Sequence, residues 1–294
     1  MLKIGTLADW FKVGLINGIK ESEKCGASGV QLYAWNELNP MTVKPEMLKT
    51  VKQTARDCGQ TITALCGELS EIRDLDHGRG LEIAQANPAR IAFLKRTIDI
   101  AKELDCSIVT THIGVIPEDQ NAERYKIMQA ACAEVAEYAA KQDAWIAIET
   151  GPEKIQTLCG FVDGIPGNRI AINYDPANLI MVTNVDEVAG VYTAGKRIIH
   201  THAKDGVMHR YAGPEMVYRI FAEGGAAAFA TIADCFEEKP LGEGNMHWTD
   251  YLIALHDTGY DGYLTIEREV GKNPGNDIRQ AVEFLKTLLS ELNF

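Results

Sequence analysis

Four short apolar runs in the second half of the chain each end in an ionisable side chain, and they constrain the fold more than any other feature. The runs are rich in β-branched residues and bounded by turn residues, which is typical of strands buried on both faces of a parallel sheet. They span residues 145–149, 170–175, 198–202 and 263–267, and they end in Glu149, Asp175, His202 and Glu267. Because an ionisable group there is costly unless it is paired or metal-bound, the four together suggest one divalent cation.

Side chains alternate between the two faces of a strand, so the direction of these four residues fixes the direction of their neighbours. If the four point into one enclosed space, the large residues between them point outward, as a surrounding layer of helices requires: Ile146, Ile148, Ile172, Tyr174, Ile199, Leu264 and Ile266. One step below the four, also facing inward, lie Ala147, Asn173, His200 and Thr265. Three of these are polar, and we predict that they orient the residues above them by hydrogen bonds. A simpler alternative, in which a carboxylate caps a helix or pairs with a lysine, explains any one of the four but not all together.

Strand-like and helix-like segments alternate along the whole chain. Four further strands are predicted at 3–8, 29–35, 61–66 and 106–114, and helices at 16–24, 44–58, 89–104, 122–141, 154–163, 186–195, 250–258 and 277–292. Eight strand–helix alternations make an α/β fold of the (β/α)8 TIM barrel type the simplest solution, and the length fits the roughly 250 residues typical of it. No Ser/Gly-rich or Pro-rich linker divides the chain, so one domain over residues 1–294 is expected. Active sites of such barrels lie where the strands end, which is where the four ionisable residues fall.

Composition argues against several classes of function. With 29 Lys+Arg against 41 Asp+Glu the formal net charge is −12, which argues against nucleic acid as the main partner. No apolar run is long enough to cross a bilayer and no signal-peptide pattern opens the chain, so no membrane partner is expected. The seven cysteines are scattered without a C-x-x-C pair, which suits reduced thiols in a cytoplasmic protein. A homo-oligomer is left open.

Two long loops and an aromatic group add candidates for binding a substrate. The loop at 67–89 is polar and carries Glu68, Arg73, His77 and Arg79. The excursion at 206–247 is longer still, and long loops in compact domains are more often functional than not. Near the predicted strand ends lie aromatic residues that form either an apolar wall against a sugar ring or ordinary packing: Trp10, Tyr33 and Trp35.

Two single residues need separate treatment. His112 ends the strand at 106–114 and is either a packed histidine or a group that contacts a substrate hydroxyl and shares in proton transfer. Lys204 lies two residues after His202, so strand alternation predicts that it also points inward, whereas Arg268 is predicted to point outward. Lys204 is therefore the better candidate for a cation that offsets three carboxylates, although a salt bridge to Asp205 or a solvated lysine explains it equally well.

The sequence resembles the sugar phosphate isomerase/epimerase group of the xylose-isomerase-like barrel superfamily, which includes ketose 3-epimerases. The resemblance rests on residues 147–149, 174–179, 200–205 and 265–269, with 240–245 and 259–262 leading into the last strand. It implies that Glu149, Asp175, His202 and Glu267 bind one divalent metal ion and that the two glutamates also handle protons. Asn178 stands where several ketose 3-epimerases have histidine, although other members of the superfamily carry asparagine there.

The residue types at this site indicate its chemistry. Three carboxylates and one imidazole favour Mn²⁺ or Mg²⁺, and Co²⁺ or Zn²⁺ can also occupy such a site. A metal that polarises a carbonyl suits proton abstraction from the adjacent carbon. One of Glu149 and Glu267 would remove the proton and the other would return it, to the same carbon in an epimerisation or to its neighbour in an isomerisation. The expected function is therefore a metal-dependent isomerase or epimerase of a sugar, keto sugar or sugar phosphate.

Two other functions use related sites. A lyase or dehydratase acting on a keto-inositol or an oxidised glycoside begins with the same proton removal, so the four residues cannot separate it from an epimerase. The loops at 67–89 and 206–247 would make that distinction. A DNA-repair endonuclease on the same barrel needs three zinc ions, and Asn178 and the net charge of −12 argue against it.

Overall fold

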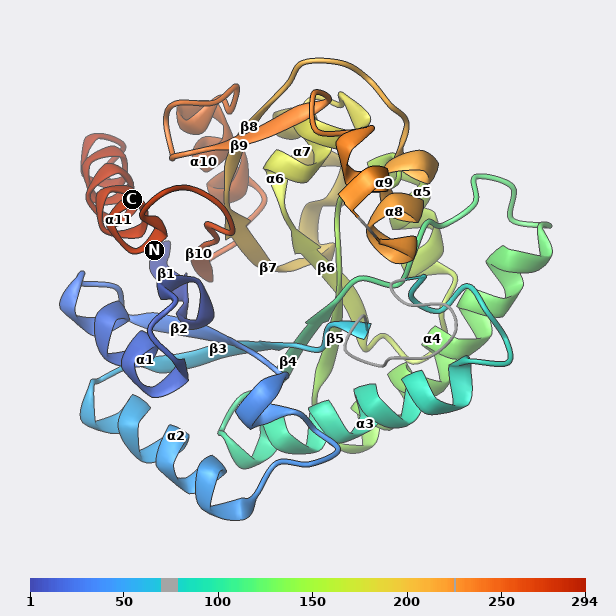
Figure 1. Cartoon of the computed structure of the whole chain (residues 1–294), viewed down its shortest axis with the longest axis horizontal. Helices are drawn as coiled ribbons and strands as arrows, with labels where there is room; N and C mark the ends of the chain where they lie inside the picture. Colours follow the sequence, from blue (N-terminus) through green and yellow to red (C-terminus); the bar gives the residue numbers. More distant parts are fainter. Residues whose placement is uncertain (70–78, 225) are drawn as a thin grey trace.

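Eight parallel strands close into a barrel, as the alternation of segments predicted (Figure 1). The computed structural model describes residues 1–69, 79–224 and 226–294, so Arg73 and His77 of the predicted loop lie outside the described residues. The barrel strands are β1 (Lys3–Leu7), β2 (Gly29–Tyr33), β3 (Thr61–Cys66), β4 (Ile108–Thr111), β5 (Trp145–Glu149), β6 (Ile170–Tyr174), β7 (Ile198–Ala203) and β10 (Tyr263–Ile266). Parallel pairing of β10 with both β7 and β1 closes the barrel.

Helices surround the barrel and follow the strands in the predicted order (Figure 1). They are α1 (Leu15–Lys24), α2 (Pro45–Asp57), α3 (Asn87–Glu103), α4 (Glu123–Lys141), α5 (Ile155–Asp163), α7 (Glu187–Ala194), α10 (Trp248–Asp257) and α11 (Pro274–Glu291). Local sequence explains several helix starts: Asp186 accepts hydrogen bonds from the first turn of α7, and a proline opens both α2 and α11. Across the described ranges, no helix is long and apolar enough to cross a bilayer.

The strand residues that were predicted to point outward pack in the core between the barrel and its helices, with one exception. Six of the seven belong to the main cluster of buried apolar side chains: Ile146, Ile148, Ile172, Tyr174, Leu264 and Ile266. The prediction for Ile199 is wrong, because this residue is only half-buried and Ile198 joins the cluster in its place. The pairing of β6 with β7 shifts register between Ile172 and Asn173, and such an irregularity interrupts strict alternation.

The predicted excursion at 206–247 contains secondary structure of its own. Its strands β8 (Asp205–Met208) and β9 (Phe236–Lys239) pair antiparallel, and α8 (Pro214–Glu223) and α9 (Ala226–Ala230) lie between them in sequence. The segment packs against the helical residues that follow β6, which are α6 (Pro176–Asn178) and η4 (Leu179–Thr183), through a small separate core. Figure 1 shows it in orange beside the yellow α6. The excursion therefore forms a small folded unit beside the carboxyl ends of the barrel strands.

Candidate functional site

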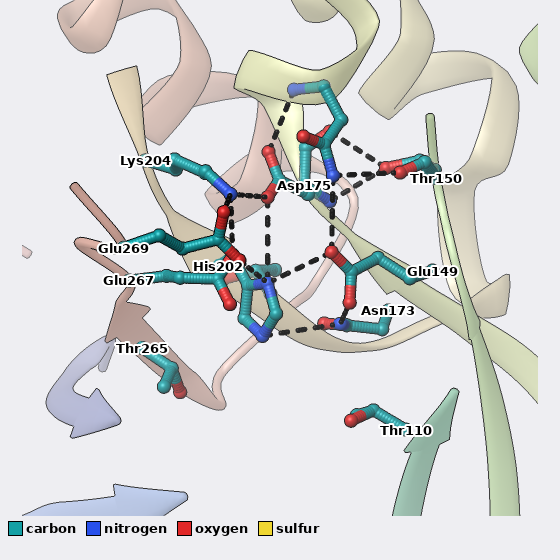
Figure 2. Close-up of polar contacts among 12 residues, drawn as sticks. Thr110, Glu149, Thr150, Asn173, Asp175, His202, Lys204, Thr265, Glu267 and Glu269 are labelled. Carbon is teal, nitrogen blue, oxygen red and sulfur yellow. Dashed lines mark hydrogen bonds and ion pairs between the residues drawn. The ribbon is translucent and has the colours of Figure 1, made fainter. Parts of the chain in front are cut away.

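The four residues that end the apolar runs meet at the carboxyl ends of β5, β6, β7 and β10 (Figure 2). One potential ligand atom from each of Glu149, Asp175, His202 and Glu267 lies within 4.8 Å of the other three. His202 Nδ1 is at the centre, at 3.2 Å from Glu267 Oε2, 3.4 Å from Glu149 Oε1 and 3.5 Å from Asp175 Oδ2. All four side chains are buried. The structure thus brings together the whole predicted ligand set.

The donor atoms of this cluster fit a divalent cation. Asp175 Oδ2 and His202 Nδ1 are buried and have no hydrogen-bond partner within the described chain, although buried polar atoms are normally paired. Burial opposes protonation of His202, yet Glu267 and Glu149 hold its pKa well above the usual value. The centre therefore attracts positive charge strongly. Three carboxylates and one imidazole nitrogen are a donor set that Mn²⁺ or Mg²⁺ accepts.

A chain of hydrogen bonds lies beneath the cluster, at the positions predicted one step below it. Thr265 Oγ1 lies 3.2 Å from His200 Nε2, His200 Nδ1 lies 2.8 Å from Asn173 Oδ1, and Asn173 Nδ2 donates to Glu149 Oε2 at 3.0 Å. Burial holds the pKa of His200 well below its usual value, so the ring is neutral. The contacts assign its proton to Nδ1, which donates to Asn173, while Nε2 accepts from Thr265. Glu149 is thereby held in one orientation.

Replacing His200 with alanine is expected to weaken metal binding by about 10–100-fold, as is usual when a group that orients a ligand is lost. The change breaks the chain between Thr265 and Asn173, so Glu149 loses a fixed partner. Metal titration of the apoprotein measures the effect, and His256→Ala is the matched control because His256 is exposed on α10. Unchanged affinity in His200→Ala would show that the chain does not support the metal ligands.

Gln31 on β2 is a site residue to which the sequence analysis gave no role. Its Oε1 lies 3.0 Å from His202 Nε2, and its Nε2 donates to Thr110 Oγ1 at 2.9 Å. In the neutral ring that a metal ligand requires, this amide orientation would place the His202 proton on Nε2 and leave the lone pair of Nδ1 directed at the cluster. The feature that could have identified it is a glutamine within a strand that is otherwise largely apolar. Its partner lies on β7, which is not a neighbouring strand, so strand alternation could not identify it.

Lys204 lies in the cluster and not at a helix start. Its Nζ is 3.0 Å from Glu267 Oε2, with Asp175, Glu238 and Glu269 oxygens within 4.0 Å. Burial opposes the charged form, but Glu267 and Glu269 hold the pKa of Lys204 well above its usual value. Asp205 instead accepts hydrogen bonds from the backbone of Gly206, Gly242 and Met246 and from the Trp248 indole. Lys204 thus supplies the cation that offsets the three carboxylates.

Glu267 carries a full negative charge in this setting. Burial would raise its pKa, but His202 and Lys204 hold the pKa well below the usual range. Arg268, the other candidate cation, instead pairs with Glu238 and Asp277.

The structure places Asn178 and His112 beside Glu149, and Glu68 on the other side of His112. Asn178 Nδ2 donates to Glu149 Oε1 at 3.1 Å. His112 lies between two carboxylates, with Nε2 at 3.6 Å from Glu149 Oε1 and Nδ1 at 3.4 Å from Glu68 Oε2. Burial opposes the charged form of His112, but Glu149 and Glu68 raise its pKa to about 10. His112 is therefore cationic and shared between the two carboxylates.

Trp35 is not brought to the same place. Its ring stacks on Tyr33 at a centroid distance of 4.3 Å, and its Nε1 donates to Asp9 Oδ1 at 2.7 Å. Of the predicted aromatic wall, Tyr33 alone lines the pocket above the four residues, and its hydroxyl lies 3.4 Å from Glu267 Oε1. The indole of Trp35 supports Tyr33 from behind.

A pocket of about 520 Å³ opens above the cluster. Its wall includes Glu68, His112, Glu149, Asn178, Lys204 and Glu267, together with residues to which sequence reasoning gave no role, among them Tyr218, Glu238 and Glu269. Tyr218 and Glu238 belong to α8 and β9 of the excursion. No local pattern pointed to them, because their approach to the strand ends depends on how the excursion packs.

Glu153, in the loop after β5, is a second buried acid near this pocket. Both of its carboxylate oxygens are buried without a hydrogen-bond partner among the described residues. Burial raises the pKa of Glu153 to about 8, with His112 opposing the shift. The folded protein therefore keeps this carboxyl protonated at neutral pH.

Glu153→Gln is expected to gain stability over the wild type as pH rises. The unfolded state loses the Glu153 proton near pH 4.5, whereas the folded state loses it only near pH 8. The contribution of this group to the free energy of unfolding of the wild type therefore decreases as the pH rises from 4.5 to 8. Glutamine does not titrate, and the difference should grow by up to about 1.4 kcal/mol per pH unit in that window. Urea unfolding at about pH 5 and about pH 8 measures it. A difference between the two proteins that does not change with pH would contradict the assignment.

Comparisons with known proteins agree with the fold. A family model described as "Xylose isomerase-like TIM barrel" matches residues 19–288. An uncharacterized protein of Methanocaldococcus jannaschii, MJ1311, is 26% identical over 214 residues. That match includes 68% of this chain and 62% of the relative, so the chain spans less than two thirds of the length of that relative.

Three solved structures share the whole barrel. A xylose isomerase domain protein from Planctomyces limnophilus has a TM-score of 0.77 at 24% identity, covering 99% of this chain and 97% of the other. A probable 3-DHS dehydratase, AsbF, from Bacillus anthracis has a TM-score of 0.73 at 16% identity, covering 97% and 99%. A D-allulose 3-epimerase from Methylomonas sp., solved with D-allulose, has a TM-score of 0.67 at 16% identity, covering 97% and 96%. At these identities the likeness shows a common fold.

Proposed function

Because the chain belongs to the xylose isomerase-like TIM barrel family, we propose that it is a divalent-metal-dependent isomerase or epimerase of a sugar, keto sugar or sugar phosphate. The observation that carries this proposal is the buried cluster of Glu149, Asp175, His202 and Glu267, in which two buried donor atoms make no hydrogen bond among the described residues. The cluster lies at the strand ends, where barrels of this type hold their active sites. The free cysteines among the described residues support a reducing, cytoplasmic setting.

These four residues would hold one divalent ion, and the ion would polarise the carbonyl of a bound substrate. Glu149 and Glu267 come from β5 and β10, which β6 and β7 separate in the barrel wall. They can therefore approach a flat substrate carbon from different sides, one removing a proton and the other returning it. Return to the same carbon gives an epimer, and return to the adjacent carbon gives an isomer.

Neighbouring side chains would hold the two glutamates in position for this exchange. His112 and Asn178 both contact Glu149 Oε1, which fixes the direction of that carboxylate and offers it positive charge. Lys204 Nζ and the Tyr33 hydroxyl contact the two oxygens of Glu267. His112 and Asn178 also line the pocket and can donate hydrogen bonds to substrate hydroxyls.

A lyase or dehydratase on a keto-inositol or an oxidised glycoside is the second candidate. The likeness of the barrel to that of a probable 3-DHS dehydratase supports this candidate. Elimination would begin with the same proton removal by a glutamate, and it would differ in expelling a hydroxyl or alkoxyl from the next carbon. A DNA-repair endonuclease finds less support, because the metal-binding group found among the described residues suits one ion.

Product analysis tests the proposed function. The Mn²⁺-loaded protein is incubated with D-allulose, D-fructose, D-tagatose and a keto-inositol, and ¹³C NMR identifies the products. Epimers or isomers that form with metal and not after EDTA treatment support the proposal. Loss of water from the keto-inositol alone would favour the dehydratase, and cleavage of an abasic duplex by the same preparation would favour the endonuclease.

A further inference from the structure

The pocket above the candidate metal site is lined by two chemically different sets of residues. Polar residues at or just after the ends of the barrel strands form its floor, and they include Glu149, Glu267, His112, Asn178 and Lys204. Six apolar side chains also line the pocket, and together they are called the apolar wall: Met181, Val182, Val217, Phe221, Phe236 and Val270. At about 520 Å³ the pocket lies within the range of roughly 300–1,000 Å³ that holds drug-sized ligands.

Most of this apolar wall comes from the excursion and from the helical turn that it covers. Val217 and Phe221 belong to α8, Phe236 to β9, and Met181 and Val182 to η4. Met181, Val182 and Val217 are buried in the small core that joins these elements, with Phe236 packed against it. Four of the six wall residues are thus fixed by packing in or against this small core.

Two members of the wall remain open to solvent. Phe221 is 53% exposed and Val270 is 50% exposed, although both line the pocket. Large apolar side chains that are exposed together at the mouth of a pocket mark a place where an apolar group binds. A hydroxyl placed against them would lose water without gaining a hydrogen bond, which is unfavourable.

The charges around the pocket disfavour an anionic group. Six glutamates contribute to the described lining: Glu68, Glu149, Glu237, Glu238, Glu267 and Glu269. Lys204 is the lysine of that lining, and it is held 3.0 Å from Glu267. His112 is likewise shared between Glu68 and Glu149. A phosphate dianion would therefore face carboxylates whose neighbouring cations are already engaged.

We propose that the substrate is an uncharged keto sugar that carries an apolar substituent at the end remote from its carbonyl. The inference rests on the proposed function, because a carbonyl that must reach the four residues of the floor directs the remote end of the sugar toward Phe221 and Val270. The substituent then covers the apolar wall and removes both its own surface and that of the wall from water.

Three ketohexoses that differ at one remote position test the proposal: D-fructose, 6-O-benzyl-D-fructose and D-fructose 6-phosphate. Calorimetric titration of the Mn²⁺-loaded protein measures the dissociation constant of each. The benzyl ether is expected to bind about tenfold or more tightly than D-fructose, which is the gain from burying part of one aromatic ring. The phosphate is expected to bind more weakly than D-fructose. Equal binding of the ether and D-fructose, no binding of the ether, or tightest binding of the phosphate would each overturn the proposal.

Substitutions in the apolar wall test whether the benzyl group binds there. Phe221→Ala and Val270→Thr should each reduce the preference for the benzyl ether severalfold, because each weakens binding of the ether more than binding of D-fructose. Met216→Ala is the matched control, because Met216 is a 42% exposed apolar residue of the same helix α8 that does not line the pocket. A preference for the ether that survives both wall variants would place the benzyl group elsewhere and contradict the proposal.

Binding does not require turnover, so this experiment separates the two proposals. If the ether is preferred but no keto sugar is converted, the apolar wall stands and the proposed reaction fails. If D-fructose is epimerised or isomerised and the ether is not preferred, the reaction stands and the assigned substrate class fails.

Discussion

Replacing either Glu149 or Glu267 with glutamine is expected to lower kcat by about 10²–10⁴-fold, which is the usual contribution of a positioned acid or base. Glutamine has nearly the same size and keeps one oxygen that can face the metal, but it cannot accept a proton at neutral pH. Both glutamates should be needed, because a reversible transfer requires a base on one side of the substrate and an acid on the other. Steady-state kinetics on a substrate identified by product analysis measure the loss.

Metal content must be measured in the same preparations, so that lost chemistry is distinguished from lost metal. Glu137→Gln is the matched control, since Glu137 is exposed on α4 and pairs only with Lys141 among the described residues. One of the two site variants can still exchange a substrate proton with solvent without forming product, and its missing glutamate is then the group that returns the proton. Full activity in either variant would contradict the two-glutamate mechanism.

Asp175→Ala and His202→Ala are each expected to lose most of the bound metal. Each change removes one of four ligands and, with it, one of the two buried atoms that have no hydrogen-bond partner in the described chain. Elemental analysis after dialysis should give about one ion per chain for the wild type and far less for either variant, as loss of a direct ligand exceeds the 10–100-fold expected for a supporting residue.

His209→Ala provides the control for this experiment, because His209 is half exposed in the excursion and lies outside the cluster. Circular dichroism should show that all variants keep the barrel. Two or three tightly held zinc ions per wild-type chain would contradict a single-ion site and would revive the endonuclease alternative.

Strand alternation predicted the barrel and the convergence of the four residues because the relevant strands are regular up to their ends. Asp175 and Glu267 each follow directly after the last paired residue of β6 and β10, so the inward direction persists. Lys204 extends the same alternation one step beyond β7. Alternation did not hold at Ile199, where the pairing of β6 with β7 shifts register.

Other features depend on tertiary contacts that a local pattern does not contain. The strand predicted at 29–35 ends at Tyr33, so Trp35 lies beyond the regular strand and does not reach the pocket. Gln31 meets His202 across the barrel interior, between strands that are not neighbours. The excursion forms its apolar wall only because α8 and β9 pack on η4, and its short, charged strands carry little sequence signal.

Solvent exchange of the proton next to the substrate carbonyl tests the central claim most directly. The Mn²⁺-loaded protein is incubated in D₂O with the keto sugar that it converts, and ¹H NMR and mass spectrometry locate the label. Proton transfer through Glu149 and Glu267 predicts one deuterium at the carbon next to the carbonyl, in product and in recovered substrate, with none in a Glu149→Gln/Glu267→Gln double variant. Product that forms without solvent deuterium and retains the substrate hydrogen would indicate a hydride shift and would contradict the account.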